Sequence, residues 1–267
     1  MEVLRRLSCI MLMAGVLLPL TYLIPPIDLT GSLAVAAYWI AESGGTTGTT
    51  IITISMVAVL LGRSGLSWKQ RGTELLVIVL ALASLFGGAA YLNEFVVKPY
   101  FAVPRPDIIE LAKPSPDTSV LKMSVKEFYE MSTKADRSAH LKKVLKTDGD
   151  PPMDELVQCH WIHETGYSFP SGHSFSAMLV ATVFLALGLS YFSQARLWVF
   201  YLLVAWAVAV CYSRPILRVH WPRDVCVGGV EGILVGVVAF LMVRGILKFV
   251  SPERVFLTNP SQGSASI

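Results

Sequence analysis

Two histidines and one aspartate provide the groups in this sequence that are best suited to covalent chemistry. Asp224 follows His220 by four residues, about one helical turn, so its carboxylate can accept the N–H of one ring nitrogen. Such an acceptor fixes the imidazole tautomer and leaves the other nitrogen free to act as a nucleophile. His173 has no carboxylate close to it in the sequence, which makes it the better candidate for a general acid.

Three cations accompany these groups and predict that the substrate is an anion. Lys98, Arg105 and Arg214 lie near the ends of apolar segments, and the planar guanidinium of arginine suits the oxygens of phosphate. Pro170 and Pro222 mark expected helix starts, where free backbone N–H groups add capacity to bind an anion. Together with two histidines, this set suits substitution at phosphorus, in which one imidazole attacks and the other protonates the departing alkoxide.

The composition predicts the kind of protein that must position these groups. The 267 residues are 54% hydrophobic and 15% charged, with a net charge of +3, which is too apolar for an ordinary soluble domain. Lys and Arg are scattered rather than gathered in blocks, so nucleic acid is not an expected partner. We expect an all-α polytopic membrane bundle with six spans, at Leu7–Ile24, Thr49–Gly62, Leu75–Val97, Phe175–Phe192, Leu197–Tyr212 and Val225–Val250.

The first apolar run has two interpretations. Arg5 and Arg6 followed by an apolar stretch are typical both of a first span and of a signal peptide. A cleavage-type sequence, Ala34–Ala36, lies well beyond the run, so we favour a retained span. Leu33–Ala41 is expected to be an interfacial helix.

Basic residues in the short connections predict the orientation. They fall on one side of a six-span layout, which is then the cytoplasm: Arg5, Arg6, Arg63, Lys69, Arg71, Arg196, Arg244, Lys248 and Arg254. We therefore expect one domain over residues 1–267, with a cytoplasmic tail at 251–267 and an extracytoplasmic helical cap at 99–168. A capping box at Ser124 should open a cap helix toward Lys146, and a second should run from Met153 to about His163.

Three motifs in the sequence resemble those of a known family. Lys98-x6-Arg105-Pro106, Pro170-Ser171-Gly172-His173 and Ser213-Arg214-x5-His220-x3-Asp224 are similar to the three signature motifs of the type 2 phosphatidic acid phosphatase superfamily, at all eleven positions. Within it, His160-Trp161, Glu164-Thr165-Gly166 and His220–Asp224 resemble the phosphatidylglycerophosphate phosphatase B group of bacterial enzymes.

The resemblance implies a lipid phosphate phosphatase of the bacterial inner membrane, with its active site on the extracytoplasmic side. His220 would form a phosphohistidine with help from Asp224, and His173 would protonate the leaving group. The phosphoryl oxygens would be held, without metal or other cofactor, by Lys98, Arg105, Ser171, Gly172 and Arg214. The expected partners are membrane lipids and a lipid phosphate, with phosphatidylglycerophosphate placed first, undecaprenyl diphosphate next, and phosphatidate or diacylglycerol pyrophosphate behind.

Other interpretations of these residues stay open. His163, His173, His220 and Asp224 could ligate zinc, although three nearby cations favour an anion. The motifs also resemble glucose-6-phosphatase and the vanadium haloperoxidases, and a non-catalytic lipid-phosphate binder or transporter could share the fold.

Three further carboxylates have expected roles of their own. Glu94 should pair with Lys98 one turn away. Glu231 should make a buried hydrogen bond inside the sixth span. Glu164 is a candidate contact for a lipid head group.

Overall fold

A computed structural model describes residues 1–115, 118–148 and 151–250. Within these ranges every regular element is a helix, which confirms the all-α prediction, while the predicted tail at 251–267 lies outside the described residues. The elements are α1 (Glu2–Leu17), α2 (Ser32–Gly44), α3 (Thr46–Leu61), α4 (Trp68–Leu92), α5 (Lys98–Phe101), α6 (Pro106–Leu111), α7 (Val125–Glu130), α8 (Lys134–Asp148), α9 (Glu155–His163), α10 (Gly172–Tyr191), α11 (Trp198–Ile216) and α12 (Pro222–Val250). Short 3₁₀ helices follow α1 at Leu18–Leu23 and precede α11 at Gln194–Arg196.

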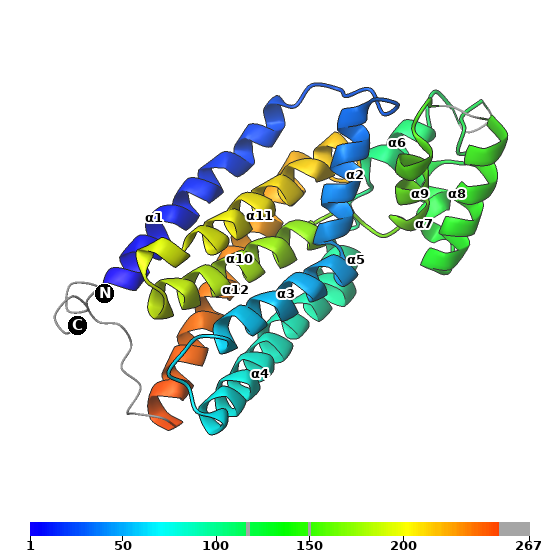
Figure 1. Ribbon diagram of the computed structural model, residues 1–267. Helices are drawn as coiled ribbons and strands as arrows, with labels where there is room; N and C mark the ends of the chain where they lie inside the picture. Colours follow the sequence, from blue (N-terminus) through cyan, green and yellow to red (C-terminus); the bar gives the residue numbers. More distant parts are fainter. Residues whose placement is uncertain (116–117, 149–150, 251–267) are drawn as a thin grey trace.

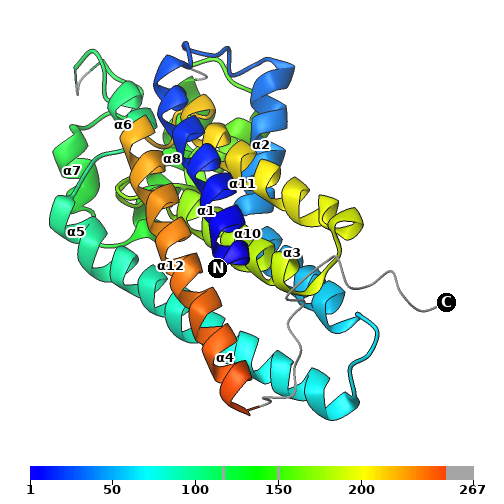
Figure 2. The same ribbon diagram turned by 90° about the vertical axis from the view of Figure 1, so that its left-hand side faces the viewer.

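Helix α10 is the centre of the bundle, and α12, α11, α1 and α3 surround it (Figures 1 and 2). Its residues from Ser174 to Ser190 are all buried, in keeping with a helix that is apolar on every side. The surrounding helices instead expose large apolar side chains, among them Leu12, Ile54, Leu202 and Leu234. Outward apolar surface of this extent is typical of a bundle that faces lipid.

The number of spans depends on how one bent pair is counted. Five described helices are long and apolar enough to cross a membrane, and α2 with α3 makes a sixth if this pair, bent by 61°, is one span. The predicted interfacial helix at Leu33–Ala41 is thus the first arm of that pair. The bend falls at Gly45, whose extended backbone separates the two helices.

Glycines on one face of α12 bring it against α10. A methyl group added at Gly228 would meet the carbonyl oxygen of Ser171, and one added at Gly232 would meet that of Phe175. Only hydrogen fits at such contacts, because a backbone carbonyl cannot rotate away as a side chain can. The start of α10 is therefore fixed against α12, where both helices carry predicted site residues.

Helix α4 changes its winding before it reaches Lys98. Residues Asn93–Val97 form a π-helical turn, which leads into α5. The Asn93 amide donates to both carboxylate oxygens of Glu231 at 2.8 and 2.9 Å, which confirms the hydrogen bond predicted for Glu231. One inserted residue of this kind rotates the next helical turn relative to an unbroken helix.

The 99–168 segment contains four helices, α6 to α9, two more than the sequence predicted. The capping box at Ser124 is confirmed, but its helix ends at Glu130. A second reciprocal cap, between Thr133 and Asp136, begins α8 instead. The helix predicted from Met153 to His163 is α9, and α6 was not predicted.

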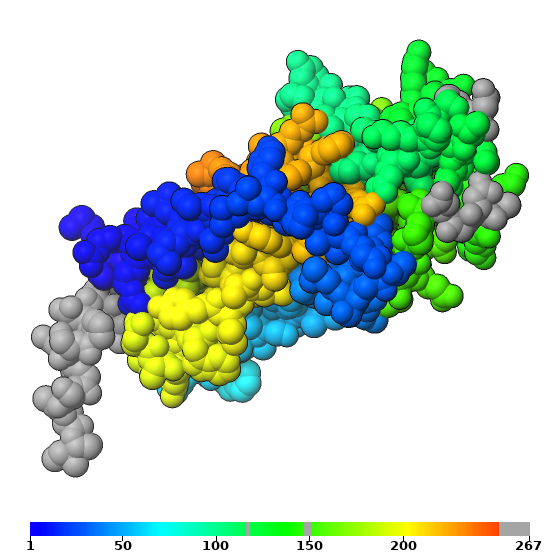
Figure 3. Space-filling model, turned by 90° about the horizontal axis from the view of Figure 1, so that it is seen from above, coloured from blue at the N-terminus to red at the C-terminus, as the bar shows by residue number. Residues whose placement is uncertain are grey.

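These four helices share a second apolar core with α2, which includes Phe128 and Trp161. The segment lies at one end of the bundle (Figures 1 and 3). The N-terminus, the α3–α4 and α10–α11 connections and the end of α12 lie at the other end. Elements that carry Arg5, Arg63, Arg196 and Lys248 therefore share one end, as the basic pattern requires. The side of a membrane that this end faces stays a prediction.

Candidate functional site

His220 lies in the turn between α11 and α12, with its side chain only 1% exposed. Its Nδ1 is 3.5 Å from Oδ2 of Asp224, close enough for an ion pair but without a hydrogen bond, and that oxygen accepts a hydrogen bond from the Trp221 backbone N–H at 3.0 Å. Its Nε2 faces Nη1 of Arg105 at 3.2 Å. One ring nitrogen thus faces a carboxylate and the other a guanidinium, while the predicted hydrogen bond from His220 to Asp224 stays a prediction.

Arg105 reaches His220 from the residue just before α6, and backbone carbonyls fix its side chain. Its Nε donates to the carbonyl of Gly166 at 2.8 Å and its Nη1 donates to that of Val219 at 2.9 Å. Nη2 forms an ion pair with Oε2 of Glu164 at 2.7 Å. Every nitrogen of this buried guanidinium therefore has a partner, and its position is set by two other chain segments, 164–166 and 219–220.

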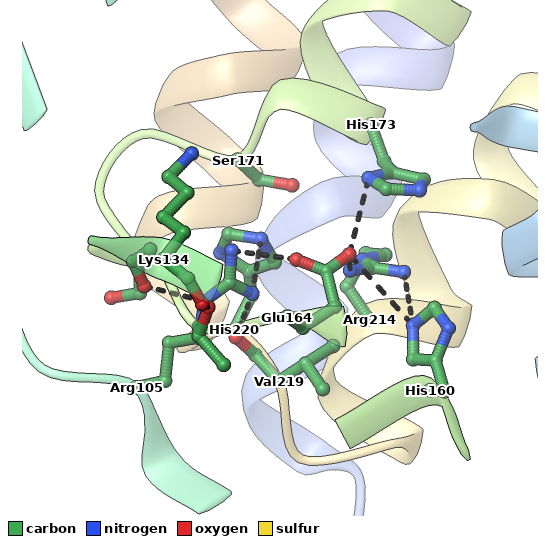
Figure 4. Close-up of polar contacts among 12 residues, drawn as sticks. Arg105, Lys134, His160, Glu164, Ser171, His173, Arg214, Val219 and His220 are labelled. Atoms are coloured by element: carbon green, nitrogen blue, oxygen red, sulfur yellow. Dashed lines mark hydrogen bonds and ion pairs between the residues drawn. The ribbon is translucent and has the colours of Figure 1, made fainter. Parts of the chain in front are cut away.

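Glu164 lies between two arginines that approach from opposite sides (Figure 4). Besides its pair with Arg105, its Oε1 is 2.5 Å from Nη2 of the fully buried Arg214. The same oxygen is 3.9 Å from Nδ1 of His173. A carboxylate therefore occupies the point at which both predicted phosphate-binding arginines and one predicted catalytic histidine converge.

This arrangement shifts the pKa of Glu164 and of His220 downward. Burial alone would raise the pKa of the Glu164 carboxyl, but the charges of Arg105 and Arg214 outweigh it and hold that pKa well below its usual range. Burial lowers the pKa of His220 well below its usual value, and both arginines lower it further. At neutral pH Glu164 is therefore charged, and His220 is a neutral imidazole whose unprotonated nitrogen carries a lone pair.

His173 and Ser171 enter the site at the start of α10. Ser171 is the N-cap, where its hydroxyl accepts from the Ser174 backbone N–H, and its own N–H donates to the Asp224 carbonyl at 3.0 Å. His173, one residue into the helix, has a side chain that is 21% exposed. The sequence suggested that His173 has no nearby carboxylate, whereas the fold brings Glu164 to it across nine residues.

Lys98 approaches from α5 and is paired, as predicted, with Glu94. Its Nζ lies 2.9 Å from Oε2 of that residue, and Lys134 of α8 forms an ion pair with the other oxygen of Glu94. The Lys98 side chain is 12% exposed. In the structure as described, Lys98, Arg105 and Arg214 each already face a carboxylate.

A cavity of about 900 Å³ adjoins the site between α3, α4 and α10. Lys98, Gly172 and His173 line one part of it. Apolar side chains form most of the rest, including Ile54, Val57, Leu82 and Phe86. Polar groups at one end of a large apolar cavity fit an amphiphile whose charged head and hydrocarbon tail require different surroundings.

Two contacts near the site could not be found from the sequence. His160 of α9 bonds to Arg214 through Nε2 at 2.9 Å and to Glu42 of α2 through Nδ1 at 3.1 Å. The sequence gave neither His160 nor Glu42 an expected role in the site. The two residues are 118 positions apart, and no motif connects them.

The described part of the chain does not provide a set of ligands for the zinc site that the sequence left open. Within it, no group of three or more His, Cys, Asp or Glu side chains is arranged to hold a metal ion. His163, one of the potential ligands, hydrogen-bonds the Cys159 carbonyl of its own helix at 2.7 Å.

The fold and the site define a multi-pass helical membrane protein with a cluster of two histidines and three cations at one end of its bundle. The chain belongs to the PAP2 superfamily, whose family profile matches residues 73–247. The resemblance drawn from the motifs is thereby confirmed.

Individual relatives carry names that agree with this assignment. Phosphatidylglycerophosphatase B of Escherichia coli (strain K12) is 33% identical over 180 residues, which cover 67% of this chain and 65% of that relative. The chain thus spans just under two thirds of the length of this relative. A putative undecaprenyl-diphosphatase of the same strain is 34% identical over 86 residues, 32% of this chain and 40% of the relative. An undecaprenyl-diphosphatase of Sulfolobus acidocaldarius is 41% identical over 68 residues, 26% of this chain and 30% of the relative.

Proposed function

We propose that this protein is a membrane lipid phosphatase that hydrolyses a phosphomonoester or diphosphate through a phosphohistidine on His220. The observation that carries the proposal is the position of Glu164, whose carboxylate oxygens lie 2.7 Å from Arg105, 2.5 Å from Arg214 and 3.9 Å from His173. A site that gathers two guanidinium groups and an imidazole around one oxyanion is suited to a phosphoryl group at the same point.

The geometry supports Nε2 of His220 as the nucleophile. A guanidinium can only donate hydrogen bonds, so the Nε2 that faces Arg105 carries the lone pair and the ring proton is on Nδ1, toward Asp224. Attack of Nε2 on phosphorus forms the P–N bond while the bond to the lipid oxygen breaks. Asp224 then stabilises the positive charge that remains on the imidazole ring.

His173 completes the reaction as an acid and then as a base. The negative charge of the bound phosphoryl group favours the imidazolium form of His173, which gives its proton to the lipid oxygen as that oxygen leaves. In the second half it takes a proton from water, which attacks phosphorus and breaks the P–N bond. Inorganic phosphate and neutral His220 result, and His173 is protonated again.

The remaining predicted site residues hold the phosphoryl oxygens in this proposal. Lys98, Arg105 and Arg214 supply charge, and Ser171 and Gly172 supply hydrogen bonds at the start of α10. Binding requires Glu164 to give up its two arginines. Its carboxylate is then free to accept hydrogen bonds from hydroxyls of a lipid head group, the role suggested by the sequence.

The proposed substrate is a lipid because the apolar cavity continues from the cation site toward the lipid-facing helices. Phosphatidylglycerophosphate is our first choice and undecaprenyl diphosphate our second, the order in which the names of the relatives also support them. Phosphatidate and diacylglycerol pyrophosphate come after these two. We place the chain in the bacterial inner membrane as a single domain, with the cap and the site on the extracytoplasmic side.

The decisive experiment measures phosphate release by the detergent-solubilised protein from phosphatidylglycerophosphate and undecaprenyl diphosphate. It is run with a metal chelator, for the native protein and for His220→Ala. We expect chelator-resistant release that disappears in the variant, together with an acid-labile phosphate label on the native protein only. Release by His220→Ala would overturn the nucleophile, and binding of lipid phosphate without release by the native protein would establish the binder or transporter instead.

A further inference from the structure

His160 is a buried histidine whose two ring nitrogens both have partners. The side chain is 4% exposed, with Nδ1 at 3.1 Å from Oε1 of Glu42 and Nε2 at 2.9 Å from Nη1 of Arg214. The contacts join α9, α2 and α11. Figure 4 shows the His160 ring beside the Arg214 guanidinium, on the side away from His220.

The partners determine which ring nitrogen carries the proton. Arg214 can only donate, so Nε2 of His160 must be the acceptor in this contact. The proton of the neutral ring is then on Nδ1, where the Glu42 carboxylate accepts it. A doubly protonated ring would lose its contact with Arg214 and place two cations side by side. Burial, the largest effect, lowers the pKa of His160; the Glu42 hydrogen bond opposes this and Arg214 adds to it, so the ring is held in its neutral form.

The contact between His160 and Arg214 matters most for the orientation of Arg214 when Glu164 moves away from this arginine. Among the described residues, the Arg214 guanidinium has two hydrogen-bond partners, Glu164 and His160, and its Nε has none. A phosphoryl group that displaces Glu164 therefore leaves His160 as the protein group that directs this side chain. The side chain of a buried arginine without such a partner could adopt several orientations.

We infer that His160 is a positioning residue, which orients Arg214 toward phosphate through a Glu42–His160–Arg214 relay anchored in α2. The inference rests on the proposed function, because it takes Arg214 to bind the phosphoryl group. It also gives the α2–α3 bend a role, since Glu42 lies two residues before Gly44, where α2 ends beside the lipid cavity.

The first test reads the tautomer directly in the native protein. The chain has five histidines, so ¹⁵N-histidine labelling of the solubilised protein and a difference spectrum against His160→Gln assign this ring. At neutral pH we expect Nδ1 protonated and Nε2 bare, the tautomer that is less common for a free imidazole. A spectrum with Nε2 protonated, or with both nitrogens protonated, would overturn the relay. Among the described residues, the other charged or titratable groups that face the ring are Glu164 at 3.9 Å and, measured between ring centroids, Tyr38 at 5.8 Å and His173 at 6.5 Å.

The second test compares two variants that differ in one acceptor. His160→Gln keeps a carbonyl oxygen near the position of Nε2, whereas His160→Leu has none. We expect the leucine variant to bind inorganic phosphate, measured as a competitive inhibitor, about tenfold more weakly than the native protein. The glutamine variant should recover most of this affinity. Equal loss in both variants, or no loss in either, would overturn the inference.

A control and an independent readout separate this inference from the proposed function. His163→Gln, at an exposed position on the same helix, should leave phosphate affinity unchanged. If the native protein releases no phosphate, the proposed function fails, but the tautomer still decides whether the relay exists. If phosphate release is normal but the His160 ring is not protonated on Nδ1 alone, only the inference of the relay fails.

Discussion

At the scale of single residues, Glu164 neutralises Arg105 and Arg214 at once and is itself only 16% exposed. We predict that Glu164→Gln destabilises the protein by about 3 kcal/mol, because it leaves two buried cations without a counterion. The same change should strengthen phosphate binding, since phosphate no longer competes with a carboxylate. Melting temperatures with and without phosphate measure both effects, and phosphate should raise the melting temperature of the variant more than that of the native protein.

A matched control for this experiment is Glu110→Gln, because Glu110 pairs with the partly exposed Arg218. It should cost little stability and leave the response to phosphate unchanged. A phosphate response in Glu164→Gln no larger than in the control would contradict the prediction.

Acidification should remove the stabilising effect of Glu164. The pKa of this carboxyl in the folded protein lies well below its ordinary value of 4.5. Its contribution is therefore complete above about pH 4.5 and is lost as pH falls further toward the folded value. The stability difference between the native protein and Glu164→Gln should be constant near neutral pH and shrink below that point. A difference that does not change with pH would contradict this assignment.

Asp224 offers a second prediction at this scale. Asp224→Asn should reduce the rate of phosphate release between about 10² and 10⁴-fold, because an amide that donates to Nδ1 would favour the wrong tautomer of His220. Lys126→Gln is the control, since that side chain is 84% exposed and pairs with the exposed Glu130 on its own helix. Single-turnover phosphorylation of the protein measures the chemical step. A near-native rate in Asp224→Asn would remove Asp224 from the proposed mechanism.

At the scale of elements, the contact between α12 and the first turn of α10 joins packing to activity. Gly228→Ala would place a methyl group against the Ser171 carbonyl, and the Ser171 N–H is bonded to Asp224. We predict a loss of about 1–3 kcal/mol in stability and a loss of activity larger than this instability explains. Gly245→Ala, on the same helix but with open space around the added methyl, should be neutral in both measurements. Gly228→Ala with full activity would show that the two helices can separate without cost to the site.

The helices were the part of the fold most open to prediction from the sequence. Long apolar runs identified α10, α11 and α12, and the capping box at Ser124 identified the start of α7. The predicted continuation of this helix to Lys146 was wrong. The helix ends at Glu130, and the cap formed by Thr133 and Asp136 begins a separate helix, α8. The α2–α3 bend was missed because a short apolar helix before Gly44–Gly45 has the same composition whether it lies on a membrane or forms part of a span.

At the scale of the whole molecule, the motifs predicted which residues meet but not how their charges are balanced. His173, His220 and Asp224 reach one end of the bundle, as expected from their places at the ends of apolar runs. Glu164 between two arginines and Glu42 behind His160 depend on contacts between distant segments. A sequence motif contains only residues that are close together in the sequence. It therefore cannot predict a carboxylate that a distant segment places in the site.

The orientation of the molecule provides the last prediction. Topology reporters inserted after Lys146 in α8 and after Arg196 before α11 should report opposite sides of the membrane, with Lys146 outside. The two positions lie on elements at opposite ends of the bundle. Active reporter on the cytoplasmic side at Lys146 would contradict the proposed outward site while leaving the fold intact.

The π-helical turn at Asn93–Val97 has a consequence for how this chain can vary in length. Removing one residue there would restore a regular helix and turn α5 and its Lys98 by about 100° relative to α4. With Asn93 held against Glu231, Lys98 would leave the cavity. Single-residue deletions in this turn should therefore be far more damaging than deletions in the α3–α4 connection, and homologous chains should keep a fixed residue count between Asn93 and Lys98 even where their loops differ.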